Sequence, residues 1–411
     1  MNDMISLTAD NLDCFVRRID ALGGPGHPAA RAMLDRAHYQ PATSPDTSLD
    51  PFGPQWLQQQ LDLHREISGR GLDQAANEQV DIDIDRHVAA PNAYDHWFPK
   101  PFSDHLTRLL SVLRLADPRR GSILLDMGCG WGLSSEFMAQ AGLQVVAMDI
   151  NPQFVALVNR RAARLGLPIT AHIGEFDHWG PAHPVDQVLF YECLHHALRP
   201  WEVLRRFATT LNKDPGCHIL MAGEPVQAHW WPHWGLRLDG ESLYVMRKHG
   251  WFESGFSLDF IRRCLALAGL EPIVENVLDP TLGQVLAGRW RALHGMAWLQ
   301  ALAESEGITA DGTGGLTLTA DATMRFGALP RELALVMHLH NPGPGPLNLQ
   351  ISANHMQEHV LLPGPNVVTI AGIQGGARLV MELRKRSLAT RLFGGGGSAE
   401  CRLEGFDFPP C

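Results

Sequence analysis

The 411-residue sequence lacks the long apolar run that a membrane-spanning helix needs. No stretch approaches the roughly 18 apolar residues typical of such a helix, so we expect no membrane span. Residues 1–20 carry four aspartates and no positively charged start followed by an apolar segment, so we expect no secretory signal. None of the seven cysteines forms a Cys-x-x-Cys pair, which is typical of free thiols in a reducing compartment. These absences together predict a cytoplasmic protein.

Basic residues are also scarce. The formal net charge is −10, so we expect no nucleic-acid partner. The lysines, far fewer than the arginines, are Lys100, Lys213, Lys248 and Lys385. This bias is typical of a GC-rich bacterial genome. Hydrophobic residues make up 45% of the chain, enough for a sizeable core.

The first 118 residues show no regular alternation of strands and helices. Residues 22–54 are rich in glycine, proline and serine, so we expect residues 1–54 to form an irregular arm after one short helix. Apolar residues at helical spacing then predict helices starting near Pro54 and over residues 102–115. We interpret residues 55–118 as a helical cap.

Between residues 119 and 311, short apolar runs alternate with helical patterns. The main predicted strands are residues 123–127, 145–150, 169–173, 187–191 and 218–222. The predicted helices between them are residues 134–141, 154–165 and 201–211. A further helix at 258–267 and strands at 272–277 and 283–287 complete the pattern. Such alternation predicts an α/β fold with a Rossmann-like, doubly wound parallel sheet.

From residue 312 the apolar period changes to two, with turn signals between the runs. Residues 312–411 are therefore predicted to form an antiparallel β-sandwich. This accessory domain is a candidate for binding a glycan or a partner, or for self-association into a homo-oligomer.

The most specific segment reads Leu125-Asp-Met-Gly-Cys-Gly-Trp-Gly132 and lies between a predicted strand and a predicted helix. Glycines spaced by two allow a sharp turn and a close approach of the backbone to a ligand. Asp149 ends the next predicted strand, where a carboxylate can accept hydrogen bonds from the two hydroxyls of a ribose.

This spacing, with Asp126 before it, resembles motif I of class I S-adenosylmethionine-dependent methyltransferases. The resemblance implies that the glycine turn holds the methionine part of S-adenosylmethionine and that Glu175 and Phe176 hold the adenine. The family usually has Asp where this chain has Glu175. The cofactor-binding residues that the resemblance implies are Asp126, Gly128, Cys129, Gly130, Gly132, Asp149, Ile150, Glu175, Phe176 and Glu192.

The segment Tyr191-Glu-Cys-Leu-His-His196 resembles the strand-four motif of the same family, which lines the methyl-transfer cleft. A hydroxyl nucleophile must lose its proton, and histidine suits that task at neutral pH. We predict His196, or else His195, as the general base, and Glu224 as a second acid–base candidate. A purely structural role for the histidine pair stays open.

Residues 234–243 and 249–256 resemble segments of bacterial methyltransferases associated with surface polysaccharides and glycans. That resemblance implies transfer to a sugar hydroxyl of a glycan or glycolipid precursor. Residues 227–256 are dense in aromatics, which suit stacking on a sugar ring. The predicted acceptor contacts are Trp230, Trp231, His233, Trp234, Arg237 and Tyr94. Packing of these aromatics in the core is the alternative.

Other readings of the sequence stay open. The acceptor could be a small natural product or lipid with an oxygen or nitrogen nucleophile, or the domain could be an inactive binding module. Ligand spacing typical of zinc is absent, so we predict no metal site, although a Mg²⁺ that orients two sugar hydroxyls remains an alternative. The Asn/Asp-Pro-Pro-Tyr/Phe motif of enzymes that flip bases is absent, which argues against nucleic-acid methylation.

Overall fold

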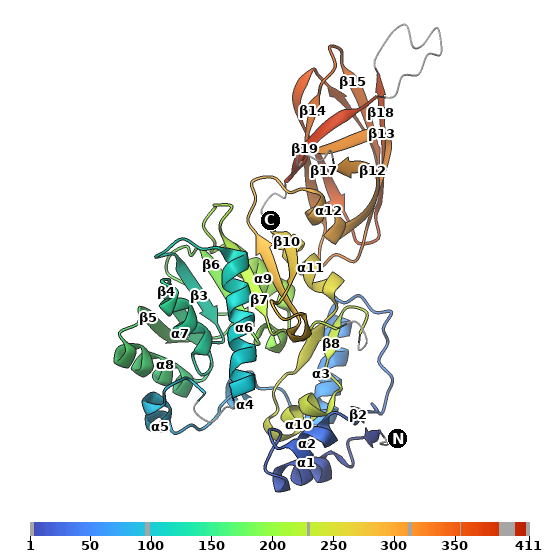
Figure 1. The fold of residues 1–411 in the computed structure, drawn as a ribbon. Helices are drawn as coiled ribbons and strands as arrows, with labels where there is room; N and C mark the ends of the chain where they lie inside the picture. The colour runs from blue at the N-terminus through green and yellow to red at the C-terminus, as the bar shows by residue number, and fades with distance from the viewer. Residues whose placement is uncertain are drawn as a thin grey trace. The chain divides into compact units, whose positions relative to one another are not determined.

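The computed structural model describes residues 4–94, 99–227, 231–310, 315–353, 355–385 and 399–407 (Figure 1). The chain divides into two compact units. The first consists of Met1–Asn212, Gly216–Cys264 and Val274–Ala287, and the second of Lys213–Pro215, Leu265–Ile273 and Gly288–Cys411. Within the described residues, no helix has the length and apolar character needed to cross a membrane.

A seven-stranded sheet has the order β10-β11-β7-β6-β3-β4-β5. Its strands are β3 (Ile123–Met127), β4 (Gln144–Asp149), β5 (Ile169–Ile173), β6 (Gln187–Tyr191), β7 (His218–Ala222), β10 (Glu271–Asn276) and β11 (Gln284–Arg289). The five strands from β7 to β5 pair in parallel. Every residue of β6 and β7 is buried, as expected for central strands of a parallel sheet. The predicted Rossmann-like α/β fold is confirmed.

Helices follow the strands as the sequence predicts. They are α7 (Leu133–Gln140), α8 (Pro152–Leu165), α9 (Pro200–Ala208) and α11 (Leu258–Leu267), and α6 (Pro99–Ala116) precedes β3. Local chemistry explains the start of α8, since the Asn151 side chain accepts a hydrogen bond from the Gln153 amide and Pro152 occupies the first turn. The carboxyl end of β4 therefore leads into this helix within three residues.

The N-terminal segment is more regular than the sequence predicts. Residues 1–54 contain β1 (Ile5–Leu7), α1 (Leu12–Ala21), α2 (Pro28–Leu34) and β2 (Ala37–Tyr39), and β1 pairs with β2 in parallel. The prediction of an irregular arm is therefore wrong for much of this segment. The physical reason is that Pro28 and the His27 side chain, which caps the Ala29 amide, start a helix within the glycine- and proline-rich stretch.

Between β2 and α6, the chain forms three helices: α3 (Pro54–Ser68), α4 (Gln74–Asn77) and α5 (Ile84–Ala89). The buried guanidinium of Arg161 pairs with Glu136 and donates hydrogen bonds to the carbonyls of His87 (2.6 Å) and Ala90 (3.1 Å). Breaking a buried pair of this kind typically costs about 3–5 kcal/mol. Arg161 thus fixes the segment that leads to Tyr94 against α7 and α8.

Three further short elements lie between β7 and α11. They are β8 (Trp234–Leu236), α10 (Gly240–His249) and β9 (Ser254–Phe256), and β8 pairs with β9 in antiparallel register. The Arg247 guanidinium on α10 donates to Asp13, and Lys248 donates to Asp20 at 2.6 Å. These contacts hold α1 against α10 within the first unit.

The second unit contains α12 (Met296–Leu302) and an antiparallel sheet of eight strands. The strands are β12 (Ala303–Ala310), β13 (Leu316–Phe326), β14 (Leu333–Asn341), β15 (Leu347–Ser352), β16 (Met356–Leu361), β17 (Gly364–Ile373), β18 (Arg378–Lys385) and β19 (Cys401–Asp407). Alternate residues of β14 are buried, as the period of two predicts. The antiparallel prediction is confirmed, with the refinement that the strands pair as one continuous sheet that curls upon itself (Figure 1).

Candidate active site

The glycine turn between β3 and α7 leaves its backbone accessible. Gly128 has φ +62°, and a Cβ there would lie 2.8 Å from the Cβ of Cys193. Gly130 has φ +47°, and a Cβ there would meet nothing within 4 Å. Glycine is thus required at position 128 because the loop after β6, which carries Cys193, packs closely against it. The space over Gly130, in contrast, is open to a ligand.

Asp149, at the end of β4, faces this turn. Its carboxylate accepts hydrogen bonds from the backbone amides of Gly130 and Asn151, both at 2.8 Å. Burial raises the pKa of this carboxyl above its usual range, although the two amides oppose the shift. Its oxygens have lone pairs left for further donors, such as the hydroxyls of a ribose.

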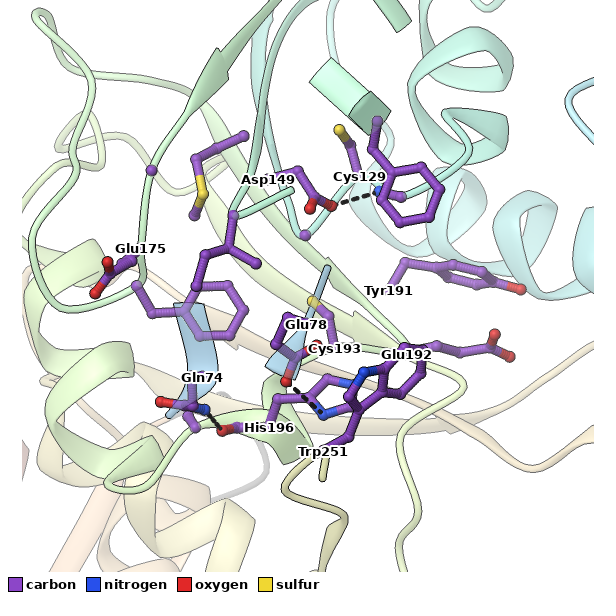
Figure 2. Close-up of a pocket in the computed structure, with 18 of the residues that line it drawn as sticks. Gln74, Glu78, Cys129, Asp149, Glu175, Tyr191, Glu192, Cys193, His196 and Trp251 are labelled. Atoms are coloured by element: carbon purple, nitrogen blue, oxygen red, sulfur yellow. Dashed lines mark hydrogen bonds and ion pairs between the residues drawn. The ribbon is translucent and has the colours of Figure 1, made fainter. Parts of the chain in front are cut away.

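A cavity of about 370 Å³ opens at the carboxyl ends of β3, β4, β5 and β6 (Figure 2). Ligands bind at this edge in open α/β sheets. The predicted cofactor residues that line the cavity are Gly128, Cys129, Gly130, Asp149, Ile150, Glu175, Phe176 and Glu192. The open space over Gly130 and the Asp149 carboxylate fit the methionine and ribose parts of S-adenosylmethionine.

Two predicted cofactor residues lie behind the cavity wall. Asp126 is fully buried and accepts hydrogen bonds from the hydroxyls of Ser134 (2.7 Å) and Ser135 (2.5 Å). Burial raises its pKa to about 6. Gly132 packs against Val158, whose Cγ2 would lie 2.8 Å from a Cβ at that position. Both residues therefore shape the turn from β3 into α7, rather than line the cavity.

His196 lines the cavity from the short 3₁₀ turn Leu194–His196 after β6. Its Nδ1 lies 3.0 Å from the Phe252 carbonyl and 3.8 Å from Oε1 of Glu78. Burial lowers the pKa of the ring, but Glu78, Glu253 and the Phe252 carbonyl outweigh that effect and raise it above 6.5. With Nδ1 donating to the carbonyl, Nε2 is the atom of the neutral ring that can accept a proton.

The other two catalytic candidates lie outside the cavity lining. Glu224 accepts hydrogen bonds from the backbone amides of Cys193, Leu194 and His195, and its Oε2 lies 2.9 Å from Nδ1 of His195. Burial opposes its ionisation, but His195 and these amides lower its pKa. Its oxygens are occupied in this way, so the structure contradicts an acid–base role for Glu224 and gives it a structural role in holding the turn that carries His196.

Glu253 brings a third group to the histidine pair. One ligand atom from each of His195, His196 and Glu253 lies within 4.8 Å of the others, so these residues could hold a metal ion. Nη1 of Arg237 lies 3.7 Å from Oε2 of Glu253 and already supplies positive charge there. The sequence did not identify Glu253 as a site residue because it is far from the histidines in the chain, although it lies within the segment 249–256 that resembles other methyltransferases.

Two of the three tryptophans predicted to contact the acceptor are part of the core instead. Trp231 donates its indole N–H to the Leu236 carbonyl and Trp234 donates to the Pro51 carbonyl, both at 2.7 Å. Both side chains are buried and pack on Trp56, with ring centroids 5.6 and 6.3 Å away. The prediction that they stack on the acceptor is wrong, because neither presents a free face to the cavity.

The remaining acceptor predictions have mixed outcomes. His233 and Arg237 are not among the cavity-lining residues, and Arg237 pairs with Asp239 at 3.1 Å. Tyr94 does line the cavity, and its ring lies 5.7 Å from that of His105. Trp230 lies outside the described residues.

Three cavity residues are absent from the predicted site residues, although Trp251 lies in the aromatic-rich segment 227–256. Gln74 and Glu78 come from α4 and its end, and Trp251 follows α10. Gln74 donates to the His196 carbonyl at 2.6 Å (Figure 2). The Trp251 indole donates to the Asn77 carbonyl at 2.9 Å. The cap therefore contributes directly to the wall around His196.

Comparison with known proteins shows which proteins this chain is similar to. Residues 124–214 match a family described as a methyltransferase domain. Ubiquinone biosynthesis O-methyltransferase from Xanthomonas euvesicatoria is 30% identical over 113 residues, 24% of this chain and 47% of that protein. The enzyme of the same name from Sodalis glossinidius is 26% identical over 175 residues, 38% of this chain and 70% of that protein.

A solved magnesium protoporphyrin IX methyltransferase from Synechocystis, with bound S-adenosylhomocysteine, is 17% identical with a TM-score of 0.37, covering 51% of this chain and 94% of that one. The chain spans about half the length of the first curated relative. The doubly wound sheet and the glycine turn at Gly128–Gly132 are consistent with the match to a family described as a methyltransferase domain. Within this chain the match lies over residues 124–214.

Proposed function

We propose that this protein transfers a methyl group from S-adenosylmethionine to an oxygen nucleophile. The observation that carries the proposal is the cavity itself. It places the Asp149 carboxylate and the open backbone at Gly130 in one lining with His196. One part of this lining suits a ribose and an amino-acid tail, and the other offers a base.

The residues of the wall have separate tasks. Asp149 holds the ribose hydroxyls, Gly128 and Gly130 admit the methionine part, and Glu175 with Phe176 holds the adenine. The Phe176 carbonyl accepts a hydrogen bond from Arg206 at 2.7 Å, which fixes the adenine-side loop. Alignment of the nucleophile with the methyl carbon, at about 3–3.5 Å, supplies much of the acceleration in such a reaction.

His196 acts as the general base through Nε2. It takes the proton of the acceptor hydroxyl while the new oxygen–carbon bond forms and the sulfur–carbon bond breaks. The products are a methyl ether, S-adenosylhomocysteine and the protonated ring. The carboxylates of Glu78 and Glu253 stabilise that positive charge.

The acceptor hydroxyl belongs to a sugar or to a phenol. The resemblance of residues 234–243 and 249–256 to polysaccharide-associated methyltransferases supports a sugar in a glycan or glycolipid precursor. The curated relatives, named for ubiquinone biosynthesis, support a ring hydroxyl of a small molecule or lipid. The aromatic side chains of Tyr94, Trp131 and Trp251 in the cavity wall suit either ring.

The full chain, incubated with methyl-labelled S-adenosylmethionine and separate glycan and small-molecule extracts, tests this function. Mass spectrometry should find label on an oxygen in one extract. Label on nitrogen would overturn the choice of nucleophile. Cofactor binding without transfer to either extract would favour an inactive binding module.

A further inference from the structure

Glu192 occupies an unusual backbone conformation directly after β6. Its φ is +53°, in the left-handed region that residues other than glycine rarely adopt. Backbone strain of this kind persists only where the surrounding structure enforces it, and strained residues are common at functional sites. The left-handed conformation of Glu192 is therefore a reason to expect a functional role for its side chain.

The neighbouring strand leaves room for this side chain. Gly223 follows β7 with φ +73°, and a Cβ there would lie 2.3 Å from Cγ and 2.8 Å from Oε1 of Glu192. Any other residue at position 223 would displace the carboxylate. The absence of a side chain at Gly223 thus helps to place Glu192 in the cavity wall.

The Glu192 carboxylate has charged neighbours but unused hydrogen-bonding capacity. Its Oε1 lies 3.6 Å from Nη1 of Arg108 and 3.7 Å from Nδ1 of His105. Both distances exceed hydrogen-bond length, and no donor among the described residues satisfies the carboxylate. Burial raises the pKa of Glu192 to about 7 while Arg108 opposes the shift, and the ionised form of the carboxyl group can accept about four hydrogen bonds. Glu192 therefore faces the cavity with acceptors free for a ligand.

The position of Glu192 separates it from the adenine side of the cavity. Figure 2 shows Glu192 beside Tyr191, on the opposite side of the pocket from Glu175. The Tyr191 hydroxyl lies 2.5 Å from Nδ1 of His105, so this side carries a cluster of polar groups from β6 and α6. A role with the acceptor fits this place better than the cofactor role that the resemblance implies.

The charge of the cavity restricts the acceptor further. The described lining contains no lysine or arginine. It contains the carboxyl groups of Glu78, Asp149, Glu175, Asp177 and Glu192. An anionic group such as a phosphate would meet repulsion here, whereas an uncharged polyhydroxy compound would not.

We propose that Glu192 selects the acceptor by accepting a hydrogen bond from a second hydroxyl, beside the hydroxyl that is methylated. The acceptor class is an uncharged diol, either a sugar diol or a catechol. This inference rests on the proposed methyltransferase function. It makes Glu192 a specificity-determining residue and leaves proton removal to His196.

The test compares Glu192→Gln with wild type in the full chain. Glu202→Gln is the matched control, because Glu202 lies partly exposed on α9 and, among the described residues, pairs only with Arg205. Titration with S-adenosylhomocysteine measures the affinity of each variant for the cofactor product. The rate of transfer of labelled methyl groups is then measured with two pairs of acceptors. Catechol is compared with its monohydroxy partner phenol, and methyl glucoside is compared with its monohydroxy partner cyclohexanol. The pair in which the dihydroxy compound is preferred shows whether the acceptor is a catechol or a sugar diol.

We expect Glu192→Gln to leave the Kd of S-adenosylhomocysteine within about twofold of wild type. It should raise the KM for the dihydroxy acceptor about tenfold, with little change for its monohydroxy partner. Loss of cofactor affinity, or an equal loss with mono- and dihydroxy acceptors, would overturn the role of Glu192.

The outcome for wild type separates the two proposals. Wild type that binds S-adenosylhomocysteine but methylates none of the four uncharged compounds overturns the acceptor class proposed for Glu192. Wild type that does not bind S-adenosylhomocysteine overturns the methyltransferase function itself.

Discussion

The glycine turn and the tryptophan-rich segment both look functional in the sequence, yet the structure uses them differently. The turn at Gly128–Gly132 lies at the cavity, with open space over Gly130. Trp231 and Trp234 are 6% and 0% exposed, and backbone carbonyls accept their indole N–H groups. A motif that reports a backbone conformation is therefore a better guide to a site than a local excess of aromatic residues.

The reason is that the two signals constrain different things. Glycines at a spacing of two between a strand and a helix require close approach of the backbone to something, and few arrangements satisfy that requirement. Tryptophans bury large apolar surfaces wherever a core offers room. Trp251 alone of the described tryptophans in residues 231–256 lines the cavity, and its spacing in the sequence gives no hint of that.

The largest expected effect follows from His196→Asn. Removal of the base should lower kcat by about 10²–10⁴-fold, the usual contribution of a general base. The affinity for S-adenosylhomocysteine should stay within about twofold, because the proposed role of His196 is with the acceptor. Steady-state kinetics and calorimetry check both values. Unchanged kcat would remove His196 from the mechanism.

The next largest effect is expected for Asp149→Asn, which tests whether the cavity beside the glycine turn binds the cofactor. The substitution keeps the size of the side chain but removes the charge that, in the proposed function, accepts hydrogen bonds from the ribose. Hydrogen bonds to charged groups contribute about 1.5–3 kcal/mol, so the Kd of S-adenosylhomocysteine should rise about 100-fold. Thermal unfolding provides the control for folding. A Kd equal to that of wild type would contradict the assignment.

Trp234→Phe and Trp251→Phe form a matched pair that tests which tryptophan of the aromatic-rich segment contacts the acceptor. Each substitution removes an indole donor to a backbone carbonyl, but only Trp251 lines the cavity. Trp234→Phe should lower the free energy of unfolding by about 2 kcal/mol without changing the acceptor KM. Trp251→Phe should raise that KM with a smaller loss of stability. The reverse pattern in urea titration and kinetics would restore Trp234 to the acceptor site.

The smallest effect concerns the pH profile. In the proposed mechanism the neutral His196 ring is the active form, so activity should fall about tenfold per pH unit as pH drops below the raised pKa of this ring. Glu78 helps to raise that pKa. Glu78→Gln should therefore move the inflection of kcat/KM to lower pH. Coincident profiles for Glu78→Gln and wild type would show that Glu78 does not influence the base.

The sequence predicts the sheet closely because each strand is a short apolar run between turn signals. The predicted strands at 123–127, 169–173, 187–191 and 218–222 agree with β3, β5, β6 and β7 residue for residue. The local pattern is sufficient there, since a buried parallel strand needs apolar side chains on both faces.

The site is only partly predictable, because several of its residues meet through tertiary contacts. Glu78 and Glu253 reach His196 from segments distant in the chain, so no spacing relates them. Glu224 looks like a free carboxylate in the sequence, yet three backbone amides and His195 occupy it. Whether a polar residue acts as a base or as a support depends on its partners, which the sequence alone does not specify.

The most direct test of the central claim is calorimetric titration of the full chain with S-adenosylhomocysteine, with Asp149→Asn in parallel. We predict one binding site per chain for wild type and affinity weakened about 100-fold for the variant. No heat of binding and no thermal shift with wild type would contradict the assignment of this cavity to S-adenosylmethionine.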